Sequence, residues 1–248
     1  MPEDQTVEIE PLSCCSLLVE TLCNGQPLAK ATGFVVDLDG SAFLITNWHV
    51  LSGRDADTDQ AMATSGALPD SLRIQHHAVG QFGMWTQKSE PLSVEGHVRW
   101  REHPRGRDVD VAALPLSDLS GVQIYPLDLK LGDSEIIPEV AMPVCIIGFP
   151  FGLSAGPGFP IWKIGHIASD PDLDFDGRPA FLIDATTREG MSGSPVVLKI
   201  SGDYRQGSIH VISGRGLKLL GVYSGRIHGQ ADIGRVWRSS TIREVLGA

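Results

Sequence analysis

The segment 188–195, R-E-G-M-S-G-S-P, constrains this 248-residue chain more than any other stretch. The pattern G-x-S-G-x-P is matched by Gly190, Ser192, Gly193 and Pro195, and it places a serine on a tight turn. A serine hydroxyl becomes a good nucleophile only when a base accepts its proton, and the turn must direct backbone N–H groups at the oxyanion that forms. Glycine suits the turn because it adopts unusual backbone angles and lets a substrate approach. The alternative is an ordinary Gly/Ser/Pro surface turn.

Two distant segments supply candidate partners for this serine. In F-L-I-T-N-W-H-V, His49 closely follows the apolar run 43–45. In D-V-D-V-A-A-L, Asp110 stands at the head of a second apolar run. The chain order His49, Asp110, Ser192 is one of the few in which a Ser/His/Asp triad recurs. The three segments together favour an activated serine over a surface turn.

These motifs resemble those of bacterial trypsin-like serine peptidases, namely the HtrA protease domains and the glutamyl endopeptidases. T-N-W-H-V resembles T-N-x-H-V, D-V-A-A-L resembles D-[ILV]-A-x-L, and G-M-S-G-S-P resembles G-[NM]-S-G-[GS]-P. A fourth segment, V-C-I-I-G-F-P-F-G at 144–152, resembles a strand and turn of the same peptidases. The likeness covers roughly residues 12–238. It implies an all-β, chymotrypsin-like double β-barrel that ends in a short helix.

The expected organisation is a single peptidase domain with a cleft between two barrels. The first barrel would contribute His49 and Asp110 to this cleft, and the second would contribute Ser192. The predicted bounds are 1–248 for the domain, 12–116 for the first barrel, 126–238 for the second barrel and 239–248 for the C-terminal helix.

Short β-rich runs bounded by Gly, Pro, Asp or Ser support this fold class. Asp39-Gly40 between apolar runs predicts a hairpin over 33–47, whose second strand would deliver His49 at its end. The polar segment 52–71 predicts a surface loop, and 239–247 predicts a helix whose apolar stripe is Ile242, Val245 and Leu246. The other expected strands are 71–79, 94–100, 109–116, 140–149, 161–168, 180–185, 194–200, 208–213 and 217–224.

Charge and hydropathy exclude several classes of partner. The net charge of −10, without any basic run, argues against nucleic-acid binding. No apolar run is long enough to span a bilayer, so we expect no membrane partner. The N-terminus, M-P-E-D-Q-T-V-E-I-E, lacks the basic and then apolar pattern of a secretion signal.

The cysteines indicate a reducing compartment. Cys14, Cys15, Cys23 and Cys145 show no disulfide-framework spacing. In secreted peptidases of the family, the residue after the histidine of the triad often forms a disulfide, and here that residue is Val50. We therefore expect reduced thiols and a cytoplasmic location. There is no C-x-x-C or H-E-x-x-H motif, so we expect no metal, and triad chemistry requires no organic cofactor.

Each candidate catalytic residue has rivals of the same type in the sequence. Ser192 is the expected nucleophile, because Ser194 lacks the following Gly-x-Pro and would begin the next strand. His49 is the expected general base because of its motif. Asp110 is the expected orienting carboxylate, and the A-x-L continuation favours it over Asp108.

The resemblance also implies the substrate-binding residues. The oxyanion hole would consist of the backbone N–H groups of Gly190 and Ser192. The floor of the S1 pocket, which binds the residue before the scissile bond, would lie near Thr186 and Thr187. Its wall, which would also pair with substrate backbone, would include Tyr223, Ser224 and Gly225.

No acidic residue stands at the expected floor, since Asp184 lies two residues earlier. Preference for Arg or Lys is therefore disfavoured, and a small or medium uncharged P1 residue is expected. Preference for Glu is the alternative, with His228 or Arg226 as the counter-charge.

Met191 departs from the zymogen pattern of the family, in which an Asp before the nucleophile pairs with a freed N-terminal amine. We therefore expect activity without N-terminal clipping, limited by narrow specificity or by a regulatory partner. The chain ends about ten residues after Trp237, so no PDZ domain is expected.

The sequence thus favours a serine endopeptidase that acts on a peptide or protein substrate. One alternative is a weak or inactive module that binds peptides along its cleft. The other is an esterase that uses the same triad. The intact His, Asp and Ser argue against the first, and the strand near Ser224 argues against the second. The natural substrate and the oligomeric state stay open.

Overall fold

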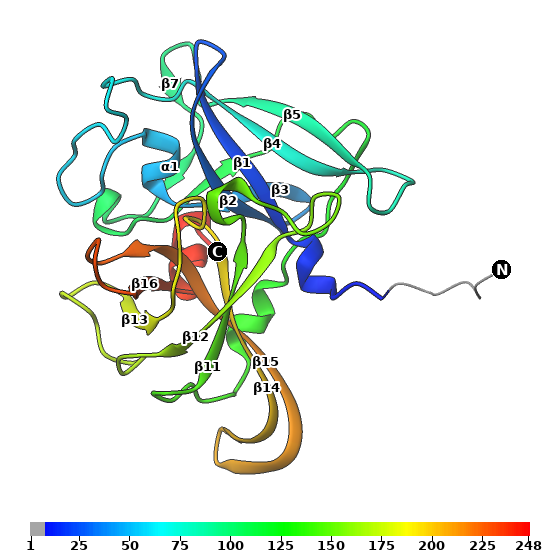
Figure 1. Cartoon of the computed structure of the whole chain (residues 1–248), viewed down its shortest axis with the longest axis vertical. Helices are drawn as coiled ribbons and strands as arrows, with labels where there is room; N and C mark the ends of the chain where they lie inside the picture. Colours follow the sequence, from blue (N-terminus) through cyan, green and yellow to red (C-terminus); the bar gives the residue numbers. More distant parts are fainter. Residues whose placement is uncertain (1–7) are drawn as a thin grey trace.

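The computed structural model of the protein describes residues 8–248. Residues 1–7, which include most of the segment expected to lack a secretion signal, lie outside this range. Antiparallel strands make up two halves that follow one another along the chain, and short helical segments connect them (Figure 1). The 3-10 segments are η1 (Pro11–Cys14), η2 (Gly106–Asp108), η3 (Leu129–Asp133) and η4 (Pro150–Gly152).

The N-terminal half is an eight-stranded antiparallel sheet in the order β10-β4-β1-β2-β3-β9-β8, with β5 paired to β4. A separate small hairpin lies between β5 and β8 in the chain. The strands are β1 (Ser16–Cys23), β2 (Gln26–Leu38), β3 (Ser41–Thr46), β4 (Ser71–Ala78), β5 (Trp85–Pro91), β6 (Ser93–Val94), β7 (His97–Val98), β8 (Arg101–Glu102), β9 (Ala112–Pro115) and β10 (Val122–Gln123).

The hairpin of β2 and β3 delivers the candidate histidine. Asp39 and Gly40 form its turn with positive φ values of 52° and 81°, as the D-G pair predicts. The strand β3 ends at Thr46, and the one-turn helix α1 (Trp48–Ser52) follows directly. His49 therefore lies where the hairpin was expected to place it.

The C-terminal half is a closed barrel in the order β11-β12-β13-β16-β15-β14. The hairpin of its two longest strands projects beyond the barrel at the bottom of Figure 1. The helix α2 (Ser240–Leu246) ends the chain. The strands are β11 (Pro143–Gly148), β12 (Ile161–Ile167), β13 (Ala180–Asp184), β14 (Pro195–Gln206), β15 (Ile209–Arg226) and β16 (Ile233–Arg238).

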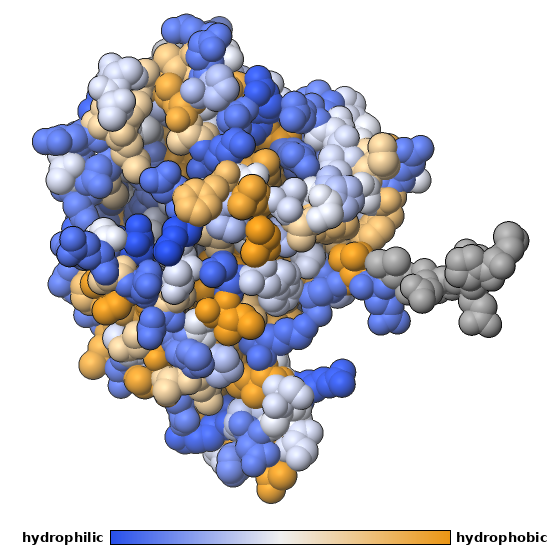
Figure 2. All heavy atoms as spheres, in the orientation of Figure 1, coloured by the Kyte–Doolittle hydropathy of each residue, from blue (hydrophilic) through white to orange (hydrophobic). Residues whose placement is uncertain are grey.

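Three apolar clusters form the core. One fills the first sheet and a second fills the barrel. The third joins the halves, because Phe34 and Ile45 of the first half pack with Val197 and Trp237 of the second. The predicted apolar stripe of α2, Ile242, Val245 and Leu246, is buried in this third cluster. The helix therefore packs where the two halves meet. On the face shown in Figure 2, apolar side chains also gather near the middle.

Some expected elements differ from the observed ones. The runs 208–213 and 217–224 belong to one continuous strand, β15, because Gly214 and Gly216 stay within the ladder with β14. The run 94–100 forms the short β6–β7 hairpin instead of a single strand. The predicted strands did not include β1, β5, β8, β10 and β16. The prediction of an all-β, chymotrypsin-like double barrel with a short C-terminal helix is nevertheless confirmed.

Candidate active site

The side chain of His49 is fixed by Asp110. His49 Nδ1 donates a hydrogen bond to Asp110 Oδ2 at 2.7 Å, and the backbone N–H of His49 donates to Asp110 Oδ1 at 2.8 Å. The amide of Asn47 donates to the backbone oxygen of Asp110 at 2.7 Å. The start of α1 and the segment before β9 are thus joined by three bonds. This geometry holds the Nδ1–H tautomer and leaves Nε2 as the proton acceptor.

Asp110 is buried, with 2% of its surface exposed, and its carboxylate is well satisfied. Besides the two bonds from His49, Oδ2 accepts a hydrogen bond from Ser224 Oγ at 2.6 Å. Its rival Asp108 is exposed in η2. The structure therefore brings Asp110, and not Asp108, to the imidazole of His49.

Ser192 reaches the same cluster through Ser224. Its Oγ donates a 3.3 Å hydrogen bond to the backbone oxygen of Ser224, the residue whose hydroxyl contacts Asp110. His49 and Ser192 also line the same two pockets. Ser194, the rival nucleophile, is fully buried and cannot meet a substrate.

The charge of Asp110 changes the titration of His49. Burial lowers the pKa of His49, but the nearby carboxylate of Asp110 and its hydrogen bond raise it, and Asp55 adds a smaller increase. The net result is a pKa above the ordinary value of about 6.5. A stabilised imidazolium is what a general base requires after it accepts a proton.

Three carbonyl groups of the turn that holds Ser192 accept hydrogen bonds from neighbouring segments. The oxygen of Glu189 accepts from the N–H of Phe151 at 2.6 Å. The oxygen of Gly190 accepts from Thr32 Oγ1 at 2.8 Å, and that of Ser192 accepts from the N–H of Thr32 at 2.8 Å. Within residues 8–248, the N–H groups of Gly190 and Ser192 have no hydrogen-bond partner. They are therefore available to a substrate oxygen, as the predicted oxyanion hole requires.

Glycine is required at both bends of this turn. Gly190 has a φ of +90°, and a Cβ there would lie 2.3 Å from the backbone oxygen of Phe149. Gly193 has a φ of +84°, and its Cβ would lie 2.1 Å from the backbone oxygen of Thr32. Both clashes are with backbone, which cannot move aside as a flexible side chain would.

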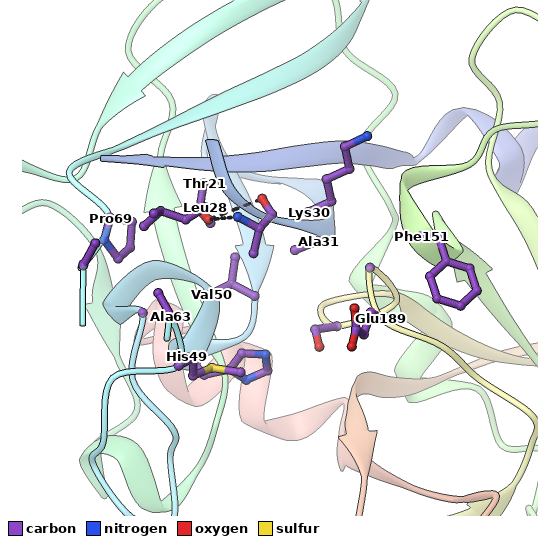
Figure 3. A pocket seen from close by; sticks show the side chains of 16 residues that line it. Thr21, Leu28, Lys30, Ala31, His49, Val50, Ala63, Pro69, Phe151 and Glu189 are labelled. Atoms are coloured by element: carbon purple, nitrogen blue, oxygen red, sulfur yellow. Dashed lines mark hydrogen bonds between the residues drawn. The ribbon is translucent and has the colours of Figure 1, made fainter. Parts of the chain in front are cut away.

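Two pockets meet at His49 and Ser192 and form one cleft. Pocket 1 has a volume of about 510 Å³ and extends toward β2 and the loop after α1 (Figure 3). Pocket 2 has a volume of about 400 Å³ and extends along the end of β15. Met62 and Glu189 line both pockets as well. A peptide that follows the cleft would therefore pass His49 and Ser192 between the two pockets.

Most of the expected substrate-binding residues lie in pocket 2. It is lined by Thr187, Tyr223, Ser224 and Gly225, and the hydroxyl groups of Thr187 and Tyr223 are hydrogen-bonded to each other. Burial raises the pKa of Tyr223, so this phenol stays neutral at physiological pH.

Of three other residues expected near the S1 pocket, only one lines pocket 2. Thr186 lines neither pocket, because its hydroxyl faces Asp232 on the exposed side of the segment. Arg226 lines pocket 2, whereas His228 does not.

Several residues of the site were not found from the sequence. Thr32 supports the nucleophile turn from β2, Ser224 contributes a hydroxyl to Asp110, and Asn47 binds the backbone of Asp110. Asn47 lies inside the quoted histidine motif and Ser224 was singled out for another role. Thr32 lies beside Gly33 in an ordinary apolar run and carries no local signal.

The structure also bears on the cysteines, on metal binding and on membrane spans. The four cysteines are unpaired, and burial raises the pKa of Cys15 to about 12. In residues 8–248, no group of three or more His, Cys, Asp or Glu side chains is arranged to hold a metal ion. Neither α1 nor α2 is long enough to cross a membrane, and no other described helix is long and apolar enough.

Solved structures share this fold at low sequence identity. The active form of the Rv3671c protease from M. tuberculosis aligns with a TM-score of 0.53 and 19% identity, over 95% of this chain and 81% of that one. The serine endoprotease from Yersinia pestis aligns with a TM-score of 0.54 and 14% identity, over 98% of this chain and 67% of that one. No curated protein matches the sequence.

Family membership comes from the sequence itself. The family model described as the trypsin-like peptidase domain matches residues 31–203. This segment contains His49, Asp110 and Ser192 together with the motif at 144–152. Because the match spans well over half of its length, the chain belongs to the trypsin-like peptidase family.

Proposed function

We propose that the protein is a serine endopeptidase that cleaves peptide bonds through an acyl-enzyme at Ser192. The observation that carries this proposal is the paired contact of His49 with Asp110. Both the ring nitrogen and the backbone N–H of His49 bind this buried carboxylate, in a cleft that Ser192 also lines. Such an arrangement orients an imidazole toward a proton donor in the cleft.

Acylation begins when the substrate carbonyl enters the cleft. Rotation of the Ser192 side chain breaks its 3.3 Å bond to Ser224 and turns Oγ toward His49 Nε2. Oγ attacks the carbonyl carbon while Nε2 accepts its proton, and Asp110 stabilises the imidazolium. The N–H groups of Gly190 and Ser192 bind the oxyanion. His49 then donates the proton to the leaving amine, and the peptide C–N bond breaks.

Deacylation repeats these steps with water. His49 accepts a proton from water, whose oxygen attacks the ester carbon. The bond from this carbon to Ser192 Oγ breaks, and His49 returns the proton to Oγ. The residues present therefore complete the reaction without a cofactor.

Pocket 2 supports a small or medium uncharged residue before the scissile bond. Its wall near Ser192 carries the paired hydroxyl groups of Thr187 and Tyr223, and Tyr223 is almost fully buried. This part of the wall offers hydroxyl groups and no carboxylate to a Lys or Arg side chain, whereas Asp55, Asp57 and Glu189 line other parts of the pocket. Arg226 in the same pocket supports Glu as the alternative residue at this position.

The proposal includes a cytoplasmic location and activity without N-terminal clipping. The adjacent, buried and unpaired thiols of Cys14 and Cys15 support the location. Support for activity without clipping comes from Met191, which is fully buried in the apolar cluster of the barrel. A regulatory partner then remains one way to limit activity.

A fluorophosphonate probe on the intact chain tests the proposal, because it labels only activated serines. We expect labelling of the unmodified protein and of Ser194→Ala, and none of Ser192→Ala. Ser194→Ala is the matched control, since it removes a buried hydroxyl from the same turn. Labelling that survives Ser192→Ala, or no labelling of the folded protein, would contradict the proposal. A peptide library and a panel of simple esters then separate an endopeptidase from an esterase.

A further inference from the structure

Pocket 1 lies on the other side of Ser192 from the end of β15. Ser224, Gly225 and Arg226 line pocket 2 and are absent from pocket 1. Under the proposed function, the acyl part of the substrate pairs with this end of β15. The leaving part of the substrate, beginning with the residue after the scissile bond (P1′), therefore enters pocket 1.

The lining of pocket 1 is mostly apolar. Figure 3 shows Val50, Ala63 and Pro69 on one side of the pocket and Phe151 and Glu189 on the other, with the ring of His49 at the lower edge. The full set of apolar lining residues is Leu28, Ala29, Ala31, Val50, Met62, Ala63, Ala67, Pro69 and Phe151.

The two charged residues of the lining stand at its edge. Lys30 extends away from the pocket in Figure 3, and its aliphatic stem lies against Gly152. Glu189 is exposed where the two pockets join. A charged P1′ side chain would therefore lose water in the middle of the pocket without gaining a partner.

The loop after α1 is folded into the wall of this pocket. Its first ten residues form a closed turn, because the N–H of Met62 donates to the oxygen of Gly53 at 2.9 Å. A Cβ at Gly53, whose φ is +68°, would lie 2.3 Å from Pro69 Cδ, so Gly53 packs directly on the proline ring. The apolar wall is thus present before a substrate arrives, which lowers the entropy cost of binding.

Two large apolar side chains of the lining remain uncovered. Met62 is 55% exposed and Phe151 is 57% exposed, and both line pocket 1. Exposed apolar surface in a concave site favours an apolar ligand, since binding removes this surface from water. The volume of about 510 Å³ accommodates a large side chain.

We propose that pocket 1 selects substrates with a large aliphatic or aromatic residue immediately after the scissile bond. This inference rests on the proposed peptidase function, and it assigns the specificity of the leaving side to β2, α1 and the loop 53–69. Val50 directly follows His49 in the chain, and Ala31, Met62 and Ala63 extend the wall.

Acyl transfer to added amines measures this preference directly. N-acetyl-alanine p-nitrophenyl ester would acylate Ser192, and amino acid amides would compete with water for the acyl-enzyme. The amine nitrogen bonds to the ester carbon, the bond to Ser192 Oγ breaks, and the amine proton passes through His49 to Oγ. The ratio of amide product to hydrolysis product reports binding in pocket 1, whatever the amount of active protein.

We expect leucinamide and phenylalaninamide to be transferred on the order of tenfold better than glycinamide or aspartic acid α-amide. Ala63→Asp, which places a carboxylate in the wall, should remove most of this preference. Ala155→Asp is the matched control, because Ala155 is exposed and lines neither pocket. This control should keep the preference.

The possible results distinguish failure of this inference from failure of the proposed peptidase function. An acyl-enzyme that transfers to all four amides equally would overturn the inference and leave the peptidase proposal intact. A preference unaffected by Ala63→Asp would also overturn it, because the selecting surface would lie elsewhere. No release of p-nitrophenolate by the folded chain, in a burst or at steady state, would overturn both.

Discussion

The contact between His49 and Asp110 determines how the site responds to pH. A general base acts only when its imidazole is neutral, and the carboxylate of Asp110 keeps the pKa of His49 above its ordinary value. Protonated His49 also stabilises the fold. This contribution is present below the unfolded pKa of about 6.5 and is lost as the pH rises through the higher folded pKa.

We predict that kcat/KM falls to half its maximum on the acid side at a pH above about 6.5. Asp110→Asn should move this limb to lower pH, because burial lowers the pKa of His49 and only the smaller effect of Asp55 would then oppose it. The same change should reduce kcat on the order of 10⁴-fold. The pH dependence of peptide hydrolysis measures both effects. Asp108→Asn, at an exposed carboxylate, should keep the original limb. The same limb in all three proteins would exclude Asp110 as its cause.

Gly190 is one of the two positions at which the nucleophile turn requires glycine. We predict that Gly190→Val lowers kcat by about 10²–10³-fold, because the added side chain meets the oxygen of Phe149 and displaces an oxyanion donor. Gly25→Val is the control, since Gly25 also has a positive φ but nothing lies within 4 Å of its Cβ. It should lose stability through backbone strain and keep its turnover per folded molecule. Normal turnover by Gly190→Val would refute the assigned donor.

At the residue scale, local motifs allowed site residues to be predicted, whereas contacts between residues far apart in the sequence could not be predicted. Gly190 and Ser192 were found because a tight turn needs particular neighbours in sequence. The hydroxyl of Ser224 was not assigned to Asp110, since 114 positions separate the two residues and only the fold brings them together. Thr186 was expected in the S1 pocket by counting from Ser192. It points outward because neighbouring side chains in an extended segment alternate in direction.

At the scale of elements, β2 connects the first sheet to the nucleophile turn of the barrel. Thr32 contributes three hydrogen bonds, one from its backbone N–H and two through its hydroxyl. The hydroxyl donates to the oxygen of Gly190 and accepts from the N–H of Phe149 at 3.1 Å. The segment 144–152, quoted for its resemblance, thus reaches the turn through the same threonine.

We predict that Thr32→Val lowers kcat by about 10²-fold with little change in KM, because small displacements of the turn misplace Ser192. The variant should also lose about 1–3 kcal/mol of stability for each buried group left without a partner. Thr32→Ser retains the hydroxyl and should restore most of kcat. A purely structural role for Thr32 would instead leave kcat per folded molecule unchanged in Thr32→Val.

The elements themselves were predictable where turns punctuate the sequence. Asp39-Gly40 marked the β2–β3 hairpin correctly, since its two residues adopt the positive φ values of that turn. The runs 208–213 and 217–224 were expected as separate strands, but pairing with β14 holds Gly214 and Gly216 between them in extended conformation. The strand β16 was not predicted, because Arg235 and Arg238 interrupt its apolar pattern. Its ladders with β13 and β15 close the barrel.

At the scale of the whole molecule, the loop after α1 also bridges the two halves. Burial raises the pKa of Asp57, but ion pairs with Arg178 and Arg235 of the C-terminal half outweigh this effect and lower it. The guanidinium of Arg107 in the first half holds the backbone oxygens of Ala56 and Asp57. The stabilising effect of the Asp57 pairs is present above the unfolded pKa and is lost as the pH falls through the depressed folded pKa.

We predict that Asp57→Asn lowers the free energy of unfolding by about 0.2–1 kcal/mol, since the carboxylate is half exposed and screened by water. The difference should shrink in about 1 M salt, where screening acts over roughly 3 Å. Urea unfolding at low and high salt measures both effects. Asp59→Asn is the control in the same loop, because among the described residues the carboxylate of Asp59 pairs with Arg54 alone and not across the halves. Equal, salt-independent losses in both variants would contradict the bridge.

The fold class could be predicted because motif order and short strands agree on it. Pocket 1 could not, since its wall combines β2, α1, the loop 53–69 and Phe151, which no periodicity relates. The polar composition of 52–71 predicted a loop. It did not predict that the apolar residues of this loop line a pocket beside Ser192.

Hydrolysis of a peptide by the intact chain tests the central claim, the convergence of His49, Asp110 and Ser192 on one reaction, most directly. With substrate in excess, the unmodified protein should turn over, and Ser192→Ala should lower kcat on the order of 10⁶-fold, because triad residues act as a unit. A double variant that also carries His49→Ala should lose almost nothing more. Turnover by Ser192→Ala at the rate of the unmodified protein would contradict the account.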